Sequence, residues 1–141
     1  IQTIMEQTIN LAWKEGMHFT TQINGHELHL DADTNNGGTD QGPRPKPLLL
    51  AALAGCTAMD VISILAKMKV VPEDFDIKVN ANIGEEHPMQ YTSMHLVYMF
   101  KGKDLPLDKL TKAIELSQEK YCGVSAMYKK FLKLTYEIQV R

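Results

Sequence analysis

The sequence predicts an α+β fold, because strand-like and helix-like patterns occupy separate blocks of the chain. Alternation of apolar and polar residues fills the first block, to about residue 33. A long apolar stretch, Leu48 to Leu65, follows and predicts a buried helix, and the last block combines alternation with helical spacing. With 141 residues, 44% of them hydrophobic and 23% charged, the chain is predicted to form one soluble domain, residues 1–141.

The first block predicts an antiparallel meander of three strands. Alternating residues mark the segments 8–13, 17–23 and 27–31. The dipeptide Asn24-Gly25 separates the second segment from the third, and Asn-Gly between alternating segments is a strong hairpin signal. The segment that follows is rich in glycine, asparagine and proline, which predicts a loop up to the long helix.

The long helix is expected to begin at Pro47 and to end near Lys69. Proline is tolerated in the first turn of a helix, and the following residues 70–72, Val-Val-Pro, should terminate it. Because the stretch is apolar almost all round, we expect a central helix that is covered on most sides. Its length approaches a membrane span, but it carries Asp60 and other polar groups, so we predict a core helix and no membrane segment.

The last block predicts two strands, two helical segments and a closing strand. Alternation predicts strands at 75–83 and 92–100. Residues 107–120 place apolar side chains at helical spacing, and residues 122–132 resemble a second helical segment. Residues 134–140 alternate again and are predicted to close the fold as a strand.

The composition excludes several classes of function. A net charge of −2 and only two arginines, Arg44 and Arg141, argue against nucleic acid as a partner. Two cysteines are too few for a secreted disulfide scaffold and indicate a cytoplasmic protein. The pair His26 and His29 would point to opposite faces of a strand, so no metal site is predicted there. No phosphate-binding loop is present, and no cofactor is predicted.

The two cysteines stand in different local contexts. Cys56 lies nine residues after Pro47, about 13 Å along the helix axis, in an apolar environment that should raise the pKa of its thiol. Cys122 lies where a helix opens, beside free backbone N–H groups that favour a thiolate. Local physics therefore makes Cys122 the readier nucleophile of a candidate redox pair. The alternative, which the local pattern favours, is two buried cysteines with a packing role only.

Two segments carry a family resemblance. Residues 37–61, GGTDQGPRPKPLLLAALAGCTAMDV, are similar to the central signature of the OsmC/Ohr family. Residues 117–125, SQEKYCGVS, resemble that family's second cysteine motif, and the separation of 66 residues between the cysteines fits. The order of elements matches from about residue 5 to the C-terminus. The chain looks most like the OsmC-like branch of the family rather than its best-studied peroxidases.

The resemblance implies an OsmC-like fold in an intertwined homodimer, with central helices wrapped by sheet. It also implies a thiol-dependent peroxidase that reduces organic hydroperoxides in the response to oxidative stress. In that scheme Cys56 attacks the peroxide and becomes a sulfenic acid, Cys122 resolves it as a disulfide, and a dithiol donor reduces the disulfide. These roles reverse the order of reactivity that the local contexts suggest.

The sequence departs from the family at the groups that activate the first cysteine. Pro47 stands where the family has a glutamate, and residues 1–43 lack the family's arginine. Arg44 is the one guanidinium near the motif and is the candidate activating cation, although a solvated loop residue is the alternative. Asp60, four residues after Cys56, shares its helix face and would oppose thiolate formation. An alternative function is therefore binding of a small apolar ligand, or oxidant sensing, without efficient peroxidase activity.

Overall fold

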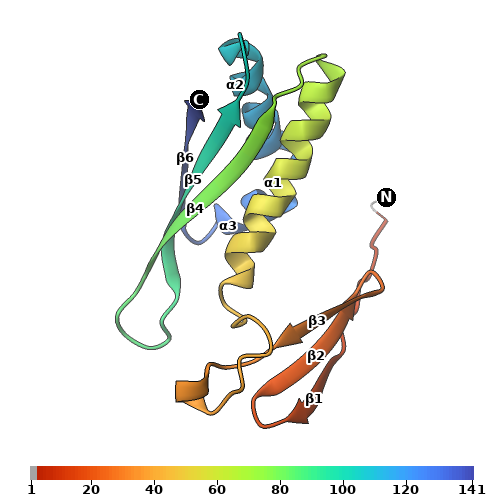
Figure 1. The fold of residues 1–141 in the computed structure, drawn as a ribbon, viewed down its shortest axis with the longest axis vertical. Coiled ribbons are helices and arrows are strands. Elements are labelled where there is room, and N and C mark those ends of the chain that lie inside the picture. Colours follow the sequence, from red (N-terminus) through yellow and green to blue (C-terminus); the bar gives the residue numbers. More distant parts are fainter. Residues whose placement is uncertain (1–2) are drawn as a thin grey trace. The chain divides into compact units, whose positions relative to one another are not determined.

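A computed structural model describes residues 3–141 of the chain (Figure 1). Two compact units make up the chain, the first ending at Leu49 and the second comprising Leu50–Arg141. The predicted α+β fold is confirmed, since two three-stranded sheets are combined with three α-helices in the described residues. That residues 1–141 form a single domain stays a prediction.

The first unit contains the predicted meander. Strands β1 (Leu11–Glu15), β2 (His18–Ile23) and β3 (His26–Leu30) pair antiparallel in that order. Asn24 and Gly25 both have positive φ angles, 52° and 82°, as a two-residue hairpin turn requires. The Asn-Gly signal therefore located this turn correctly, and β1 begins three residues later than the alternation predicted.

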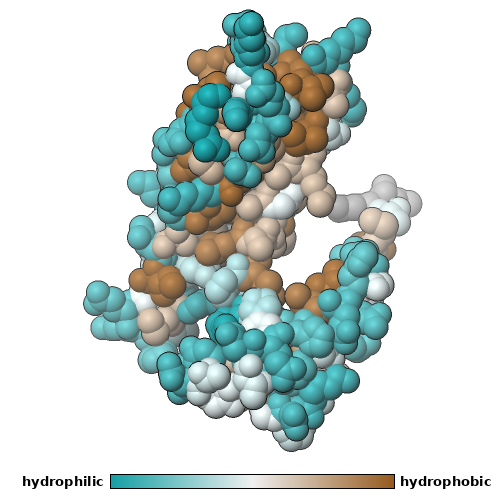
Figure 2. All heavy atoms as spheres, viewed as in Figure 1, coloured by the Kyte–Doolittle hydropathy of each residue, from teal (hydrophilic) through white to brown (hydrophobic). Residues whose placement is uncertain are grey.

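Helix α1 (Leu48–Lys67) has the predicted position but is covered on one side only by the described residues. Its buried residues form a single stripe with a spacing of four, whereas Met59 is 77% exposed and Ile62 is 43% exposed. Figure 2 shows residues of intermediate to high hydropathy over the visible side of α1. The expectation of cover on most sides is not met, because the second unit packs its own elements against just one side of this helix. The stripe consists of Leu53, Thr57, Val61 and Leu65.

By length and composition, α1 is the one helix among the described residues that is apolar enough to cross a membrane, with a mean hydropathy of 2.1. Core helices of soluble proteins meet the same criteria, so length and composition alone do not distinguish a membrane span from a core helix. The absence of a membrane segment stays a prediction.

The second unit has a sheet in the order β4 (Asp74–Ile83), β5 (Tyr91–Lys101), β6 (Lys133–Val140). Strands β4 and β5 form an antiparallel hairpin, whereas β5 and β6 are parallel. Parallel neighbours need a crossover connection, and here it carries α2 (Leu107–Leu116) and α3 (Gly123–Tyr128) (Figure 1). The crossover brings the segment around Cys122 into the second unit together with α1.

The hydrophobic core of the second unit joins α1, β5 and α2. Leu65 of α1, Phe100 of β5 and Ile114 of α2 are fully buried members of one cluster. We expect Leu65→Ala to lower the free energy of unfolding by about 2–5 kcal/mol, because it removes a buried side chain and leaves a cavity. Urea unfolding measures this loss. The matched control Val71→Ala, at a position 83% exposed, should change it by less than about 0.5 kcal/mol, and equal losses in both variants would contradict this core.

Candidate two-cysteine site

Two elements of the second unit bring Cys56, Asp60 and Cys122 together. Cys56 and Asp60 lie one turn apart on α1, so their side chains share a face of the helix. Cys122 comes from the segment between α2 and α3. The two sulfur atoms and a carboxylate oxygen of Asp60 all lie within 4.8 Å of one another. Two predicted site residues that are far apart in the sequence are therefore neighbours in space.

A π-helical turn positions Cys122. The sequence predicted one helix from 107 to 120, but α2 changes at Leu116 into a π-helix, Ser117–Tyr121. The backbone N–H of Cys122 donates to the carbonyl oxygen of Ser117 over 2.8 Å, which is the wider hydrogen bond of a π turn. Cys122 then takes an extended conformation and caps α3. Such turns within helices are frequent at functional sites.

Both sulfur atoms accept hydrogen bonds from the first turn of α3. The backbone N–H of Ser125 lies 3.3 Å from Sγ of Cys122 and its hydroxyl lies 3.1 Å from the same atom. The backbone N–H of Val124 donates to the sulfur of Cys56. Sequence reasoning missed Ser125, although a side chain three residues after a helix cap is placed to interact with it. These donors hold the two sulfur atoms in place, and the one from Val124 favours the thiolate of Cys56.

A buried chain of hydrogen bonds leads from β5 to the carboxylate of Asp60. The hydroxyls of Tyr98 and Thr57 lie 2.7 Å apart, and Thr57 lies 2.7 Å from the hydroxyl of Ser117. Ser117 donates to the carboxylate of Asp60 over 3.0 Å, and the amide of Gln118 donates to the hydroxyl of Tyr98 over 2.9 Å. This network fixes the orientation of Asp60. The sequence contained one signal for this network. Thr57 and Ser117 are polar residues at positions where the helical periodicity places buried apolar residues.

The environment of Cys56 holds its thiol in the protonated form. Burial is the largest cause that raises the pKa of Cys56, and the neighbouring Cys122 thiol and Asp60 carboxylate raise it further. The hydrogen bond from the Val124 N–H acts in the opposite direction. The direction agrees with the expectation for a cysteine in the middle of an apolar helix. Cys56 therefore forms its thiolate at a higher pH than a free cysteine does.

We expect Asp60→Asn to lower the pKa of Cys56, because the substitution removes a negative charge beside the thiolate. The pH dependence of Cys56 alkylation by iodoacetamide, followed on its own peptide by mass spectrometry, should move to lower pH. The shift should be partial, since burial remains. The control is Asp76→Asn, which replaces an exposed carboxylate on β4 and should leave the pH dependence unchanged. An upward shift in Asp60→Asn would contradict this electrostatic account.

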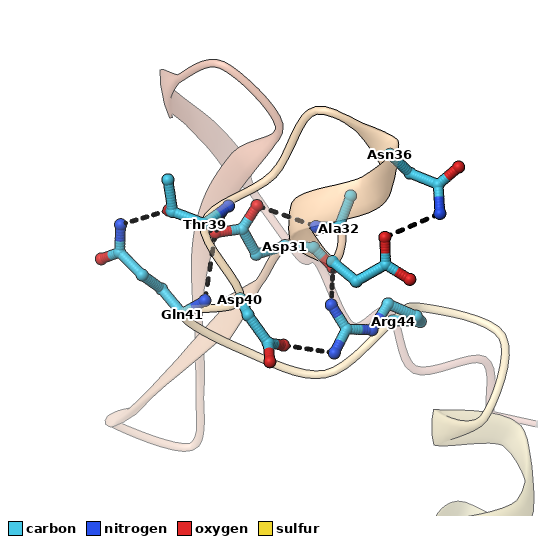
Figure 3. A network of polar contacts seen from close by, with 8 residues as sticks. Asp31, Ala32, Asn36, Thr39, Asp40, Gln41 and Arg44 are labelled. Atoms are coloured by element: carbon cyan, nitrogen blue, oxygen red, sulfur yellow. Dashed lines mark hydrogen bonds and ion pairs between the residues drawn. The ribbon is translucent and has the colours of Figure 1, made fainter.

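Arg44, the third predicted site residue, belongs to the first unit and is engaged there (Figure 3). Its guanidinium donates to the carboxylate of Asp40 and, over 3.4 Å, to the carbonyl oxygen of Asp31. The carboxylate of Asp31 in turn accepts hydrogen bonds from Thr39 and Gln41. The structure therefore gives Arg44 a local role in ordering the loop that precedes α1, through neighbours that the sequence did not indicate.

Comparison with known proteins identifies relatives over most of the chain. A family model described as OsmC-like protein matches residues 38–137. Protein YhfA of Escherichia coli K12 is 35% identical over 129 residues, which cover 91% of this chain and 93% of that protein.

Solved structures share the fold over nearly the whole length. A hypothetical protein from Aquifex aeolicus VF5 is 28% identical with a TM-score of 0.80, and the match covers 98% of this chain and 99% of that one. An organic hydroperoxide resistance protein from Elizabethkingia anophelis matches with a TM-score of 0.70 over 99% of this chain and 100% of that one. Its identity of 14% shows likeness of fold alone. The OsmC-like fold predicted for the chain is therefore confirmed.

Proposed function

Since this chain belongs to the OsmC-like family, we propose that it is a cysteine-based peroxidase that reduces organic hydroperoxides. The family includes structural neighbours described as organic hydroperoxide resistance proteins. The observation that carries the proposal is the pair of free thiols, Cys56 and Cys122, whose sulfur atoms lie within 4.8 Å of each other. A disulfide between them requires the sulfur atoms to approach to about 2.0 Å.

The proposed cycle has three steps. The thiolate of Cys56 attacks the outer oxygen of the hydroperoxide, the O–O bond breaks, and the products are a sulfenic acid and an alkoxide that takes up a proton as the alcohol. The thiol of Cys122 then attacks the sulfenic sulfur, which releases water and forms a disulfide. A dithiol donor reduces this disulfide by exchange and is itself oxidised. A reducing cytoplasm, where we place the protein, supplies such donors.

We also propose that two copies of the chain form a homodimer through the exposed apolar side of α1. Met59 and Ile62, three residues apart, lie on one side of this helix and are 77% and 43% exposed. A contiguous apolar surface of this kind marks an interaction site in a soluble protein. A second copy of the chain would supply the cover that the first lacks.

The variant Ile62→Glu tests the dimer. A carboxylate buried without a partner in the interface should weaken association by about 3 kcal/mol or more, on the order of 100-fold. Sedimentation equilibrium should find the wild type as a dimer and the variant as a monomer at the same concentration. Val140→Glu, at an exposed apolar position at the end of β6, serves as the control and should remain dimeric. A monomeric wild type would refute this interface.

A second candidate function is binding of a small apolar ligand or sensing of oxidants without efficient turnover. The raised pKa of Cys56 and the engagement of Arg44 by Asp40 favour it, because both leave the thiol without an evident activating cation. The first unit also contains an apolar pocket of about 430 Å³, a volume in the range of small-molecule sites. Its apolar lining consists of Leu11, Met17, Phe19, Leu30, Ala32 and Pro45.

Steady-state turnover separates the two functions. With a dithiol donor in excess, a peroxidase should consume cumene hydroperoxide continuously and faster than hydrogen peroxide. A sensor or ligand-binding protein should consume no more hydroperoxide than the amount that its own two thiols can reduce once. Measurement of the Cys56 pKa in the same preparation adds a second criterion, because a pKa well below the ordinary value would count against the ligand-binding function.

A further inference from the structure

The side chains of Cys56, Asp60 and Cys122 form a donor set for a thiophilic metal ion. We propose that the reduced protein binds one Zn²⁺ ion through the two sulfur atoms and the Asp60 carboxylate, with water as the fourth ligand. The three donor atoms lie within 4.8 Å of one another. Sequence spacing does not reveal this set, because one cysteine comes from α1 and the other from the far end of the crossover connection.

The distances suit a zinc ion. Zinc binds thiolate sulfur at about 2.3 Å and carboxylate oxygen at about 2.0–2.2 Å, so neighbouring ligands in a tetrahedral site lie about 3.6–3.8 Å apart. The three atoms need to move by only about an ångström to reach that spacing. Two of them, Cys56 and Asp60, are held on one helix face at a separation of four residues, which fixes their relative position.

Outer hydrogen bonds already orient each of the three ligands. The hydroxyl of Ser117 donates to the carboxylate of Asp60, and N–H donors of the first turn of α3 bond to the two sulfur atoms. Partners of this kind orient metal ligands and typically alter affinity 10-fold to 100-fold when they are removed. Ser117 is itself held by Thr57, so the support of the carboxylate extends into the buried core.

Charge and access are also consistent with a cation. Two thiolates and one carboxylate whose donor atoms lie within 4.8 Å of one another form three adjacent negative charges, and a cation between them offsets their mutual repulsion. A hollow of about 120 Å³ opens beside the carboxylate and provides a route from solvent. Two thiolates and one carboxylate select zinc over the hard ions magnesium and calcium. The hollow is lined by Asp60, Ser63, Ile64, Lys67 and Tyr121, and the lysine is exposed and free to extend its ammonium into water.

The inference concerns the same residues as the proposed peroxidase but does not depend on that activity, because it requires only the reduced thiols. A protein that binds the ion and does not turn over hydroperoxide would retain this site and lose the proposed function. A protein that turns over hydroperoxide and binds no ion would retain the proposed function and lose the metal site.

Cadmium serves as a spectroscopic probe for the zinc site. Titration of the reduced protein with Cd²⁺ should produce the ultraviolet charge-transfer band of cadmium–thiolate bonds, saturating at one ion per chain, and Zn²⁺ should displace it. Cys56→Ser and Cys122→Ser should each halve the intensity of the band. Asp60→Asn should keep both thiolates and weaken binding at least about 10-fold, and Ser117→Ala about 10-fold through loss of the orienting hydroxyl.

Glu86→Gln, which removes an exposed carboxylate from the connection between β4 and β5, is the matched control and should bind as the wild type does. Circular dichroism of each variant shows that the fold persists. Absence of the band in the wild type would overturn the site. Unchanged affinity in Asp60→Asn would overturn the role of the carboxylate, and an unchanged band in either cysteine variant would overturn the pair of sulfur ligands.

Discussion

Replacement of Cys56 by serine should abolish catalytic reduction of cumene hydroperoxide, with a loss of at least about 10³-fold in kcat/KM. The proposed first step transfers an oxygen atom to the sulfur of Cys56, and a serine hydroxyl at that position does not form the sulfenic acid. The remaining thiol, Cys122, is 3% exposed and is therefore a poor substitute nucleophile. The effect is the largest that the account predicts.

Turnover with a dithiol donor in excess measures this loss. Asp76→Asn, at an exposed position on β4, is the control and should retain wild-type turnover. Thermal unfolding of Cys56→Ser should show that the variant is folded. Unimpaired turnover in Cys56→Ser would rule out Cys56 as the residue that reacts with peroxide.

Replacement of Cys122 by serine should permit one oxidation of Cys56 per chain and then stop the cycle. The sulfenic acid formed on Cys56 has no second thiol within reach, so it persists until an external small thiol reduces it. The variant should therefore show a burst of one equivalent of hydroperoxide, followed by a steady rate far below that of the wild type.

Trapping with dimedone, a reagent that labels sulfenic acids, distinguishes the two proteins. Cys122→Ser should be labelled on the Cys56 peptide after one equivalent of hydroperoxide, whereas the wild type should resolve the sulfenic acid before it is labelled. Continuous wild-type turnover by Cys122→Ser in the absence of a small thiol would show that Cys122 is not the resolving residue.

Local sequence patterns predicted the elements of this fold well. The Asn24-Gly25 turn, the start of α1 after Pro47 and the alternation in β4 and β5 each depend on residues that are close in the sequence. Local rules of backbone conformation and side-chain periodicity are sufficient for such features. The cover of α1 was not predictable in the same way, because apolar residues on all sides do not reveal which of them the chain itself buries.

The candidate site was only partly predictable, because it depends on contacts between distant segments. The sequence identified Cys56 and Cys122 but not their proximity, which arises when the crossover connection places its π turn beside α1. Ser117, where the α-helix changes to a π-helix, belongs to a buried hydrogen-bond network with Thr57 and Tyr98, which lie 60 and 19 positions away in the sequence. Long-range packing of this kind has no local signature.

The proximity of Asp60 to Cys56 gives the site a chemistry that its family resemblance did not imply. A carboxylate that is oriented by Ser117 and lies beside two thiols raises the pKa of Cys56 and, in the same position, completes a set of metal ligands. Both consequences follow from one residue, four positions after the first cysteine. Asp60 variants therefore test the electrostatic account and the metal site together.

The central claim is that Cys56 and Cys122 form a working redox pair, and a single-turnover experiment tests it most directly. The reduced protein is mixed in a stopped-flow instrument with one equivalent of cumene hydroperoxide, quenched with acid, digested and analysed by mass spectrometry. The account predicts rapid loss of two thiols per chain and one linked peptide pair that contains Cys56 and Cys122. Oxidation no faster than that of free cysteine, with both thiols still present, would contradict it.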